Sequence, residues 1–185
     1  MAHRNILDSA KTALVVVDVQ EAFRSAIGDF ALAASNISRA VSGFSILGIP
    51  VVITEQYPKG LGKTAEEIML AVPENVEIFE KTAFSAFGSD EFVESLRSKG
   101  VSQIALCGFE AHVCVNQTAH DLIENGYEVH LLTDCVASRF DHDKLAGVEK
   151  MFAAGVIPSS VETALFDLMR DSKHPSFKEI QNLIK

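Results

Sequence analysis

Asp18, Lys81 and Cys114 are the residues in this sequence whose types could carry out chemistry together. A cysteine thiolate attacks a carbonyl carbon, a carboxylate can accept the thiol proton and later activate water, and a nearby ammonium lowers the thiol pKa. We expect Cys114 near the start of a helix, where free backbone N–H groups and the helix dipole favour an anion and could receive a tetrahedral oxyanion. The three residues are therefore a complete set for acyl transfer to water.

Each of these residues also has a simpler interpretation. A cysteine in an apolar stretch is more often buried filler than a nucleophile. Asp18 could cap the turn that follows it, and Lys81 could be an ordinary surface lysine. Residue types alone do not establish that these three residues act together as a triad.

Three other motifs give weaker evidence for a function. His112 lies two residues from Cys114, a spacing that does not bring side chains together on a helix, and we expect neither His112 nor His120 to be catalytic. Residues 141–143 (Asp-His-Asp) are more typical of a polar helix start than of a metal site. Residues 60–64 end like a phosphate-binding P-loop, but position 57 is tyrosine where that motif has its first glycine.

Short β-branched runs alternate with helical patterns along the whole chain, which predicts a mostly parallel sheet covered by helices on both faces. The fold class is three-layer α/β/α with about six strands, in one domain spanning 1–185. The sequence predicts capping boxes at the start of the last two helices, Ser159 with Glu162 and Ser176 with Glu179. The expected strands are 13–19, 49–54, 76–79, 101–107 (closed by glycine 108), 127–132 and 155–157.

This topology places the three candidate residues at one edge of the sheet. In parallel sheets the ligand crevice lies beyond the carboxyl ends of the strands. Asp18 sits near the end of the first expected strand, Lys81 just past the third and Cys114 shortly after the fourth, at the start of a helix expected over 111–125. We therefore expect their side chains to meet there.

The composition bounds the partners and the compartment. The 185 residues carry 16 basic and 25 acidic side chains, a net charge of −9, which disfavours nucleic acid and anionic membrane surfaces. The first residues lack the apolar core of a signal peptide. The three cysteines, Cys107, Cys114 and Cys135, have no C-x-x-C spacing, so we expect neither a disulfide framework nor a cysteine-rich zinc site. We expect Cys107 and Cys135 to be inert core residues. Together these features predict a cytoplasmic location.

Several segments resemble the isochorismatase-like cysteine hydrolases, and more closely the isochorismatase domain-containing proteins. Residues 13–20 (ALVVVDVQ) resemble the opening D-x-Q strand of that family, 81–87 (KTAFSAF) its lysine motif, and 108–115 (GFEAHVCV) its nucleophile segment. The separations between the three key residues, 63 and then 33 positions, also fit. Residues 55–62 and the tail 174–185 resemble the domain-containing proteins.

The resemblance implies a role for each matched residue. Asp18 would be the general base, Lys81 its electrostatic partner and Cys114 the nucleophile. A cis peptide would join Phe109 to Glu110, so that the backbone N–H groups of Glu110 and Cys114 would bind the oxyanion. Because relatives assemble, we also expect a homo-oligomer, a dimer or larger.

The same resemblance bears on the substrate. Nicotinamidases of the family hold a metal through an Asp-x-His element, but residues 54–58 contain no histidine, so we expect no metal and no cofactor. Family members that hydrolyse isochorismate typically replace the cysteine, so a small amide, ureido or related acyl substrate is expected. Glu55, Gln56 and Tyr57 could line the pocket or form a plain loop. The candidate substrate contacts are Gln20, Phe23, Tyr57 and Val113.

Two other classes of function stay open. The chain could be a binding or scaffold protein that keeps the fold without turnover, which a screen of amides and ureido compounds against Cys114→Ala would distinguish. A flavodoxin-like cofactor protein would need a phosphate-binding loop after the first strand, and residues 20–24 contain no glycine for it.

Overall fold

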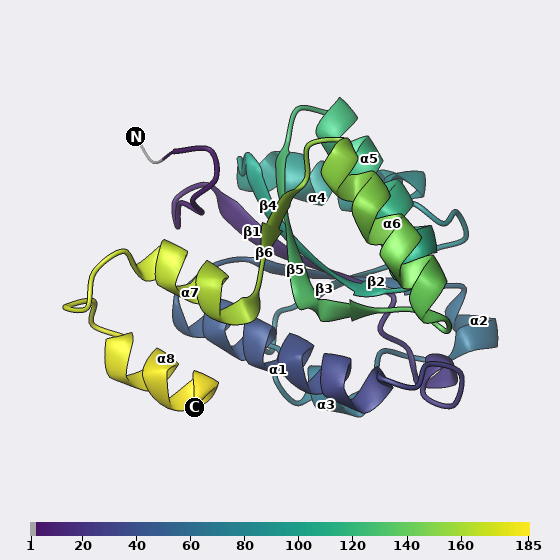
Figure 1. Ribbon diagram of the computed structural model, residues 1–185, viewed down its shortest axis with the longest axis horizontal. Helices are drawn as coiled ribbons and strands as arrows, with labels where there is room; N and C mark the ends of the chain where they lie inside the picture. Colours follow the sequence, from purple (N-terminus) through teal and green to yellow (C-terminus); the bar gives the residue numbers. More distant parts are fainter. Residues whose placement is uncertain (1–2) are drawn as a thin grey trace.

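The computed structural model describes residues 3–185 and contains one six-stranded sheet in the order β3-β2-β1-β4-β5-β6 (Figure 1). Every neighbouring pair of strands is parallel, which confirms the expected α/β architecture. The strands are β1 (Thr12–Val17), β2 (Val51–Gln56), β3 (Glu77–Lys81), β4 (Gln103–Phe109), β5 (Glu128–Ala137) and β6 (Ile157–Ser159).

β1 lies in the middle of the sheet because both of its faces are apolar. Leu14 and Val16 face one core cluster, while Ala13, Val15 and Val17 face the other, and all five are fully buried. A strand without a polar face is stable only between two layers of helices. The uninterrupted apolar run therefore explains why the sheet is covered on both sides.

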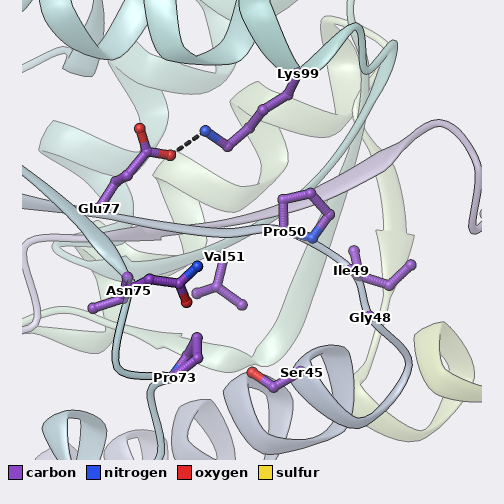
Figure 2. Close-up of a pocket in the computed structure, with 10 residues that line it drawn as sticks. Ser45, Gly48, Ile49, Pro50, Val51, Pro73, Asn75, Glu77 and Lys99 are labelled. Carbon is purple, nitrogen blue, oxygen red and sulfur yellow. Dashed lines mark hydrogen bonds and ion pairs between the residues drawn. The ribbon is translucent and has the colours of Figure 1, made fainter.

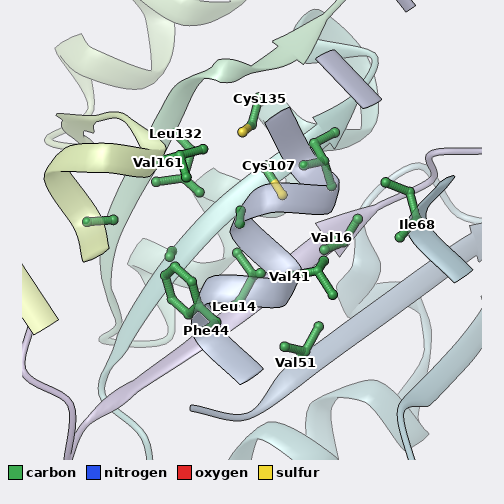
Figure 3. Packing of buried hydrophobic residues seen from close by; sticks show 14 of the residues in the cluster. Leu14, Val16, Val41, Phe44, Val51, Ile68, Cys107, Leu132, Cys135 and Val161 are labelled. Atoms are coloured by element: carbon green, nitrogen blue, oxygen red, sulfur yellow. The ribbon is translucent and has the colours of Figure 1, made fainter. Parts of the chain in front are cut away.

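The helices form two layers (Figure 1). In the first layer, Val41 and Phe44 of α1 pack in the same core cluster as Leu14 and Val16 of β1 (Figure 3). The first layer contains α1 (Phe30–Ile46), α3 (Glu66–Met69), α7 (Val161–Met169) and α8 (Phe177–Ile184), and the second contains α4 (Asp90–Lys99), α5 (Asn116–Glu124) and α6 (Asp141–Ala153). Short helices are η1 (Glu21–Phe23), α2 (Pro58–Leu61), η2 (Ala86–Gly88) and η3 (Ala111–Val115).

Several expected boundaries are wrong. Lys81 is the last residue of β3, and β4 continues through Gly108 to Phe109. The cap of α7 is Ser160, whose side chain accepts a hydrogen bond from the Thr163 amide, so the predicted Ser159 box is displaced by one residue. Ser176 does precede α8, but its side chain makes no capping hydrogen bond. Serine runs such as 159–160 leave the register of a cap ambiguous in sequence alone.

The C-terminal helix α8 packs on its own chain. Ile180 is fully buried, and Phe177 and Ile184 pack against the core cluster that contains α1 and α7. The apolar face of the tail is therefore covered in cis. Within residues 3–185, none of the helices is both long and apolar enough to cross a bilayer.

Candidate active site

Asp18 occupies a special backbone position at the carboxyl end of β1. Its φ is +53°, in the left-handed region that non-glycine residues rarely adopt and that clusters at functional sites. Its backbone N–H donates to the Thr54 carbonyl (3.1 Å), and its side chain is fully buried. Gly108 of β4 makes room here, because a Cβ at that position would lie 2.0 Å from the Val17 carbonyl oxygen. The sharp bend after Val17 turns the Asp18 carboxylate toward the edge of the sheet.

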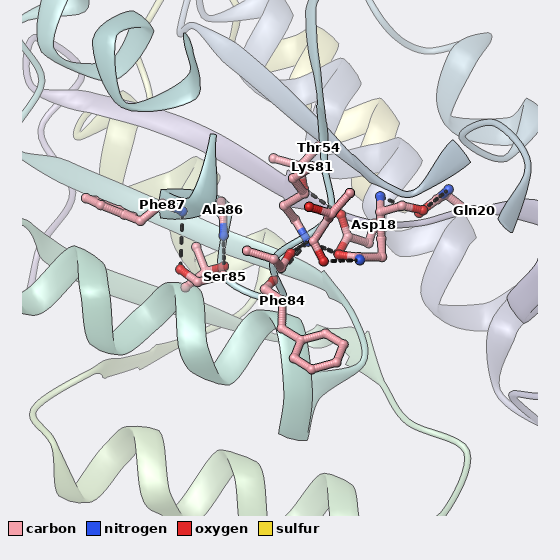
Figure 4. Close-up of polar contacts among 12 residues, drawn as sticks. Asp18, Gln20, Thr54, Lys81, Phe84, Ser85, Ala86 and Phe87 are labelled. Carbon is pink, nitrogen blue, oxygen red and sulfur yellow. Dashed lines mark hydrogen bonds and ion pairs between the residues drawn. The ribbon is translucent and has the colours of Figure 1, made fainter. Parts of the chain in front are cut away.

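Lys81 meets that carboxylate. Lys81 Nζ donates to Asp18 Oδ2 at 2.6 Å, and the side chains of both residues are 0% exposed (Figure 4). Thr54 Oγ1 donates to the other oxygen, Asp18 Oδ1, at 2.7 Å. Both carboxylate oxygens therefore have a partner, as a buried charge requires.

The Lys81 ammonium is saturated. Besides Asp18, its Nζ lies 2.8 Å from Gln56 Oε1, 2.9 Å from the Phe84 carbonyl oxygen and 3.2 Å from the Ala83 carbonyl oxygen. An ammonium has three N–H donors and here faces four acceptors. The protein itself thus supplies an acceptor for every N–H of the Lys81 ammonium, and one of these acceptors is the Asp18 carboxylate.

Cys114 completes the cluster. It lies in η3, a wide π-type turn at the start of the α5 segment, is 6% exposed, and has a thiol close enough to Asp18 and Lys81 for both charges to shift its pKa. Gly147 of α6 lets the neighbouring helix approach this turn, since a Cβ there would lie 2.6 Å from the Cα of His112. The structure therefore brings together all three residues that the sequence singled out.

The protonation state of the thiol differs from the expectation. Burial, followed by the Asp18 charge, raises the pKa of Cys114 to about 12, and the Lys81 charge lowers it only in part. The Lys81 charge lowers the thiol pKa in the direction that the sequence analysis expected, but burial and the Asp18 charge outweigh it. The raised pKa favours the neutral thiol beside the Asp18 carboxylate.

The peptide bond between Phe109 and Glu110 is cis, at the position that the family resemblance implies. The Glu110 side chain pairs with Arg139: its Oε1 accepts hydrogen bonds from Arg139 Nε (2.9 Å) and from the Arg139 backbone N–H (3.0 Å). Glu110 is 7% exposed, so this pair ties the end of β4 to the end of β5. The Glu110 side chain is thereby held away from any role as a proton acceptor.

A clamp joins the lysine loop (residues 82–88) to the helix that follows Cys114. Ser85 Oγ donates to Asp121 Oδ2 at 2.5 Å, and the Ala86 backbone N–H donates to Thr118 Oγ1 at 2.9 Å. Thr118 and Asp121 are three residues apart and so share one face of α5. The loop that carries the Ala83 and Phe84 carbonyls is therefore anchored to α5, the helix that follows Cys114.

Among the predicted substrate contacts, Gln20 is a correction. It is fully buried, its Nε2 donates to the carbonyls of Gln56 (3.0 Å) and Gly62 (2.6 Å), and its Oε1 accepts from the Gln56 N–H (2.8 Å). Its amide is committed to bracing a loop. Glu55 is also structural, since its Oε1 accepts from the Thr64 backbone N–H (2.7 Å) and hydroxyl (2.8 Å).

The other predicted contacts differ among themselves. Phe23 and Val113 are partly buried and pack against the two core clusters. Tyr57 is 53% exposed and, with Lys81 and Thr82, lines an open hollow of about 340 Å³ at the carboxyl edge of the sheet. These three residues remain predictions as substrate contacts.

The histidines near Cys114 have other partners. His112 Nδ1 lies 3.0 Å from Ser138 Oγ, and His120 Nδ1 lies 2.7 Å from the Asn116 carbonyl oxygen. Asp141 begins α6, as the polar helix-start interpretation predicted. No group of three or more His, Cys, Asp or Glu side chains suited to a metal ion was found within residues 3–185.

A second hollow, of about 400 Å³, lies at the opposite edge of the sheet, beside the starts of β2 and β3 (Figure 2). Its wall includes Pro50, Pro73 and the ion pair between Glu77 and Lys99. Its lining contains no cysteine, and it lies at the wrong end of the strands for a site built on Asp18 and Cys114.

Sequence reasoning named Gln56 only as a residue that could line the pocket, and it missed the other residues that support the triad. Thr54 and Gln56 end β2, next to the strand that carries Asp18, and each donates to or accepts from a triad side chain. Ser85 stands in the lysine motif, so its position was a signal, whereas Asp121 and Arg139 gave none. Alternate residues at the carboxyl end of a neighbouring strand are the general signal that could have identified Thr54 and Gln56.

The fold and this cluster define a class: an α/β/α protein with a cysteine, a carboxylate and a lysine at the carboxyl edge of a parallel sheet. The sequence model of the isochorismatase domain matches residues 12–163. The chain belongs to the isochorismatase family.

Its relatives agree with this assignment. The chain is 40% identical over 185 residues to isochorismatase domain-containing protein 2 of Danio rerio, covering 100% of this chain and 92% of that protein. It is 42% identical over 179 residues to isochorismatase domain-containing protein 1 of Danio rerio, covering 97% of this chain but only 62% of that longer protein. A solved structure described as the MAR1 ribonuclease of Caenorhabditis elegans superposes with a TM-score of 0.92 at 40% identity, covering 97% of this chain and 92% of that one.

Proposed function

We propose that the protein is a metal-independent cysteine hydrolase, working in the cytosol, that cleaves a small amide, ureido or related acyl compound through a covalent intermediate on Cys114. The observation that carries this proposal is the buried ion pair of Asp18 and Lys81 beside the Cys114 thiol, whose pKa both charges shift, with all three residues at most 6% exposed. A buried ion pair is costly to assemble, and here it lies against a thiol at the edge where parallel sheets bind ligands.

In the first half of the reaction, Asp18 accepts the thiol proton as Sγ forms a bond to the substrate carbonyl carbon. The carbonyl π electrons move to oxygen, and the N–H groups of Glu110 and Cys114 are the proposed donors to that oxyanion. Collapse of the tetrahedral intermediate breaks the carbon–nitrogen bond, and the leaving nitrogen takes the proton from Asp18. An acyl-enzyme thioester and a free amine or ammonia result.

In the second half, a water molecule replaces the amine. Asp18 accepts a proton from the water as its oxygen attacks the thioester carbon. The second tetrahedral intermediate expels the thiolate, which recovers its proton from Asp18, and the acid product leaves. Lys81 stays paired with Asp18 throughout, because all its donors already have protein acceptors.

The proposed substrate is small. Cys114 is nearly closed off, and the hollow of about 340 Å³ lined by Tyr57 and Thr82 adjoins Lys81. Residues 54–58 lack the Asp-x-His element of metal-dependent relatives, which supports chemistry without a metal. Tyr57, Phe23 and Val113 are the proposed substrate contacts.

Selective alkylation of Cys114 is the direct test. The protein would be treated with iodoacetamide and the rate of modification at each cysteine followed by peptide mass spectrometry. Burial raises the pKa of Cys107 and Cys135, and neither touches a base of the triad, so they serve as internal controls. We expect Cys114 to react at least about tenfold faster than either. Equal rates at the three cysteines would contradict a nucleophilic Cys114.

A substrate screen separates an enzyme from a scaffold. Small amides and ureido compounds would be tested for ammonia release with the wild type and with Cys114→Ala. Turnover that depends on Cys114 supports the hydrolase, whereas alkylation without any turnover across the screen favours a binding or scaffold role. Because one similar structure is described as a ribonuclease, RNA belongs in the screen. We expect no cleavage of RNA, because the net charge of −9 opposes binding to a polyanion.

We also propose that the chain forms a homo-oligomer. Tyr57, Phe84 and Phe140 are between 53% and 57% exposed and all follow the carboxyl ends of strands. Large aromatic side chains left exposed together on one edge are typical of a contact surface. Light scattering of the wild type and of a Phe84→Ser, Phe140→Ser variant tests this, and a monomeric mass for the wild type would contradict it.

A further inference from the structure

The four acceptors around Lys81 differ in charge. Asp18 supplies a carboxylate, while Gln56 Oε1 and the carbonyl oxygens of Ala83 and Phe84 are neutral. A neutral oxygen stabilises the ammonium without adding a second negative charge beside it. Of the three neutral acceptors, Gln56 alone is a side chain.

The orientation of the Gln56 amide is determined by its surroundings. Its Nε2 donates to the Thr82 carbonyl at 2.7 Å, so its Oε1 must be the atom that faces Lys81 Nζ at 2.8 Å. Its backbone is held as well: the Gln56 N–H donates to Gln20 Oε1 at 2.8 Å, and its carbonyl accepts from Gln20 Nε2 at 3.0 Å. Only an amide satisfies both sides. A carboxylate in its place would direct one oxygen at the Thr82 carbonyl oxygen, and the two would repel each other.

We propose that Gln56 is a positioning residue for the proposed hydrolase: its amide holds Lys81 without a competing charge, so that the lysine charge stays committed to Asp18 and Cys114 can lose its proton to Asp18. This inference rests on the proposed function. It assigns Gln56 an electrostatic role rather than a contact with substrate.

Two substitutions separate this role from simple bracing of the loop. Gln56→Glu keeps the size of the side chain and adds a negative charge beside Lys81. Gln56→Met keeps the size, removes both side-chain hydrogen bonds and adds no charge. If Gln56 only braces the loop, the methionine variant is the more damaging, because it loses both bonds. If Gln56 keeps the charge around Lys81 undivided, the glutamate variant is the more damaging.

The measurement is the rate of iodoacetamide alkylation at Cys114 from pH 6 to pH 10, with peptide mass spectrometry to resolve the cysteines and thermal unfolding to confirm folding. A like charge nearby raises a thiol pKa by on the order of one unit, so we expect Gln56→Glu to react about tenfold more slowly and its pH profile to move about one unit upward. We expect Gln56→Met to stay within about threefold of the wild type, with its profile unmoved. Gln181→Glu, on α8 far along the chain, adds the same charge and should match the wild type.

The outcomes are distinguishable. A methionine variant slower than the glutamate variant, or a glutamate variant with an unmoved profile, overturns the role of Gln56 and leaves the proposed hydrolase intact. A wild-type Cys114 no more reactive than Cys107 and Cys135 overturns both. Should Gln56→Glu not fold, the methionine variant still decides: a loss of about tenfold or more in its alkylation rate contradicts the inference.

Discussion

The two ends of β3 carry ion pairs of opposite character. At its start, Glu77 pairs with Lys99 of α4 beside an open hollow, and the two side chains are 44% and 18% exposed (Figure 2). At its end, Lys81 pairs with Asp18, and both side chains are 0% exposed (Figure 4). The same short strand thus supplies a solvated pair at one edge of the sheet and a buried pair at the other.

The difference shows where the molecule concentrates its chemistry. An exposed ion pair typically contributes about 0–1 kcal/mol, because water solvates both partners almost as well as they solvate each other. A buried pair gives little net stability, but removing one partner leaves a desolvated charge. The hollow at the Glu77 edge is larger than the one beside Lys81, yet the reactive groups lie at the other edge. Charge burial identifies the site better than the size of a hollow does.

The largest expected effect comes from breaking the buried pair. Lys81→Met removes the ammonium and leaves the Asp18 carboxylate buried with Thr54 as its remaining side-chain partner. We expect the free energy of unfolding to fall by about 3–5 kcal/mol, as for other buried pairs that lose one member. Urea denaturation measures this, and Cys114 alkylation should fall in the same variant because Asp18 loses its counter-charge. The double variant Lys81→Met, Asp18→Asn should recover part of the lost stability. A loss below about 1 kcal/mol in Lys81→Met would mean that the pair behaves like a surface pair.

Features of the site that depend on local sequence patterns can be predicted from the sequence, whereas features that depend on burial cannot. The parallel sheet was predictable, because the apolar run of β1 on both faces and the strand–helix alternation depend on local patterns. That Asp18, Lys81 and Cys114 meet was also predictable, because strand ends share an edge. The raised pKa of Cys114 was not, because burial depends on how η3 packs under α6. Gln20 was misassigned for a similar reason: a glutamine at a strand end looks the same in sequence whether it faces a ligand or a backbone carbonyl.

The next effect in size concerns the clamp on the lysine loop. Ser85→Ala removes the hydrogen bond to Asp121 and leaves that carboxylate less well satisfied. We expect a loss of about 1.5–3 kcal/mol in stability, the usual range for a hydrogen bond to a charged group. Because the loop carries the Ala83 and Phe84 carbonyls that hold Lys81, Cys114 alkylation should also slow severalfold. Ser102→Ala, at an exposed position before β4, is the matched control and should change neither quantity. If Ser85→Ala left the alkylation rate unaltered, the anchoring of the lysine loop would have no effect on the reactivity of Cys114.

A smaller effect, dependent on pH, is expected at the opposite edge. Burial lowers the pKa of His130, near the start of β5, and its Nε2 has no hydrogen-bond partner within the described residues. The folded state therefore favours neutral His130, so its contribution to stability is present above the unfolded pKa of about 6.5 and is lost as the pH falls below that value. We expect the melting temperature of His130→Gln to fall less between pH 7.5 and pH 5.5 than that of the wild type. His142→Gln, whose side chain is 81% exposed, should follow the wild type. Equal pH dependence in all three proteins would mean that His130 titrates normally.

The smallest expected effect is at Glu77, and it decides whether the two ends of β3 are independent. Glu77→Gln removes the charge facing Lys99 but keeps an oxygen that can accept from the Ser95 hydroxyl. We expect a change in unfolding free energy of at most about 1 kcal/mol, which shrinks further in high salt because the pair is solvated. Cys114 alkylation and its pH profile should be unchanged, since Asp18 and Lys81 have no partner in common with Glu77. A shifted Cys114 pH profile in Glu77→Gln would mean that a charge at the start of β3 affects the thiol at the other edge of the sheet. The cluster of Asp18, Lys81 and Cys114 would then be less isolated from the rest of the protein than its contacts indicate.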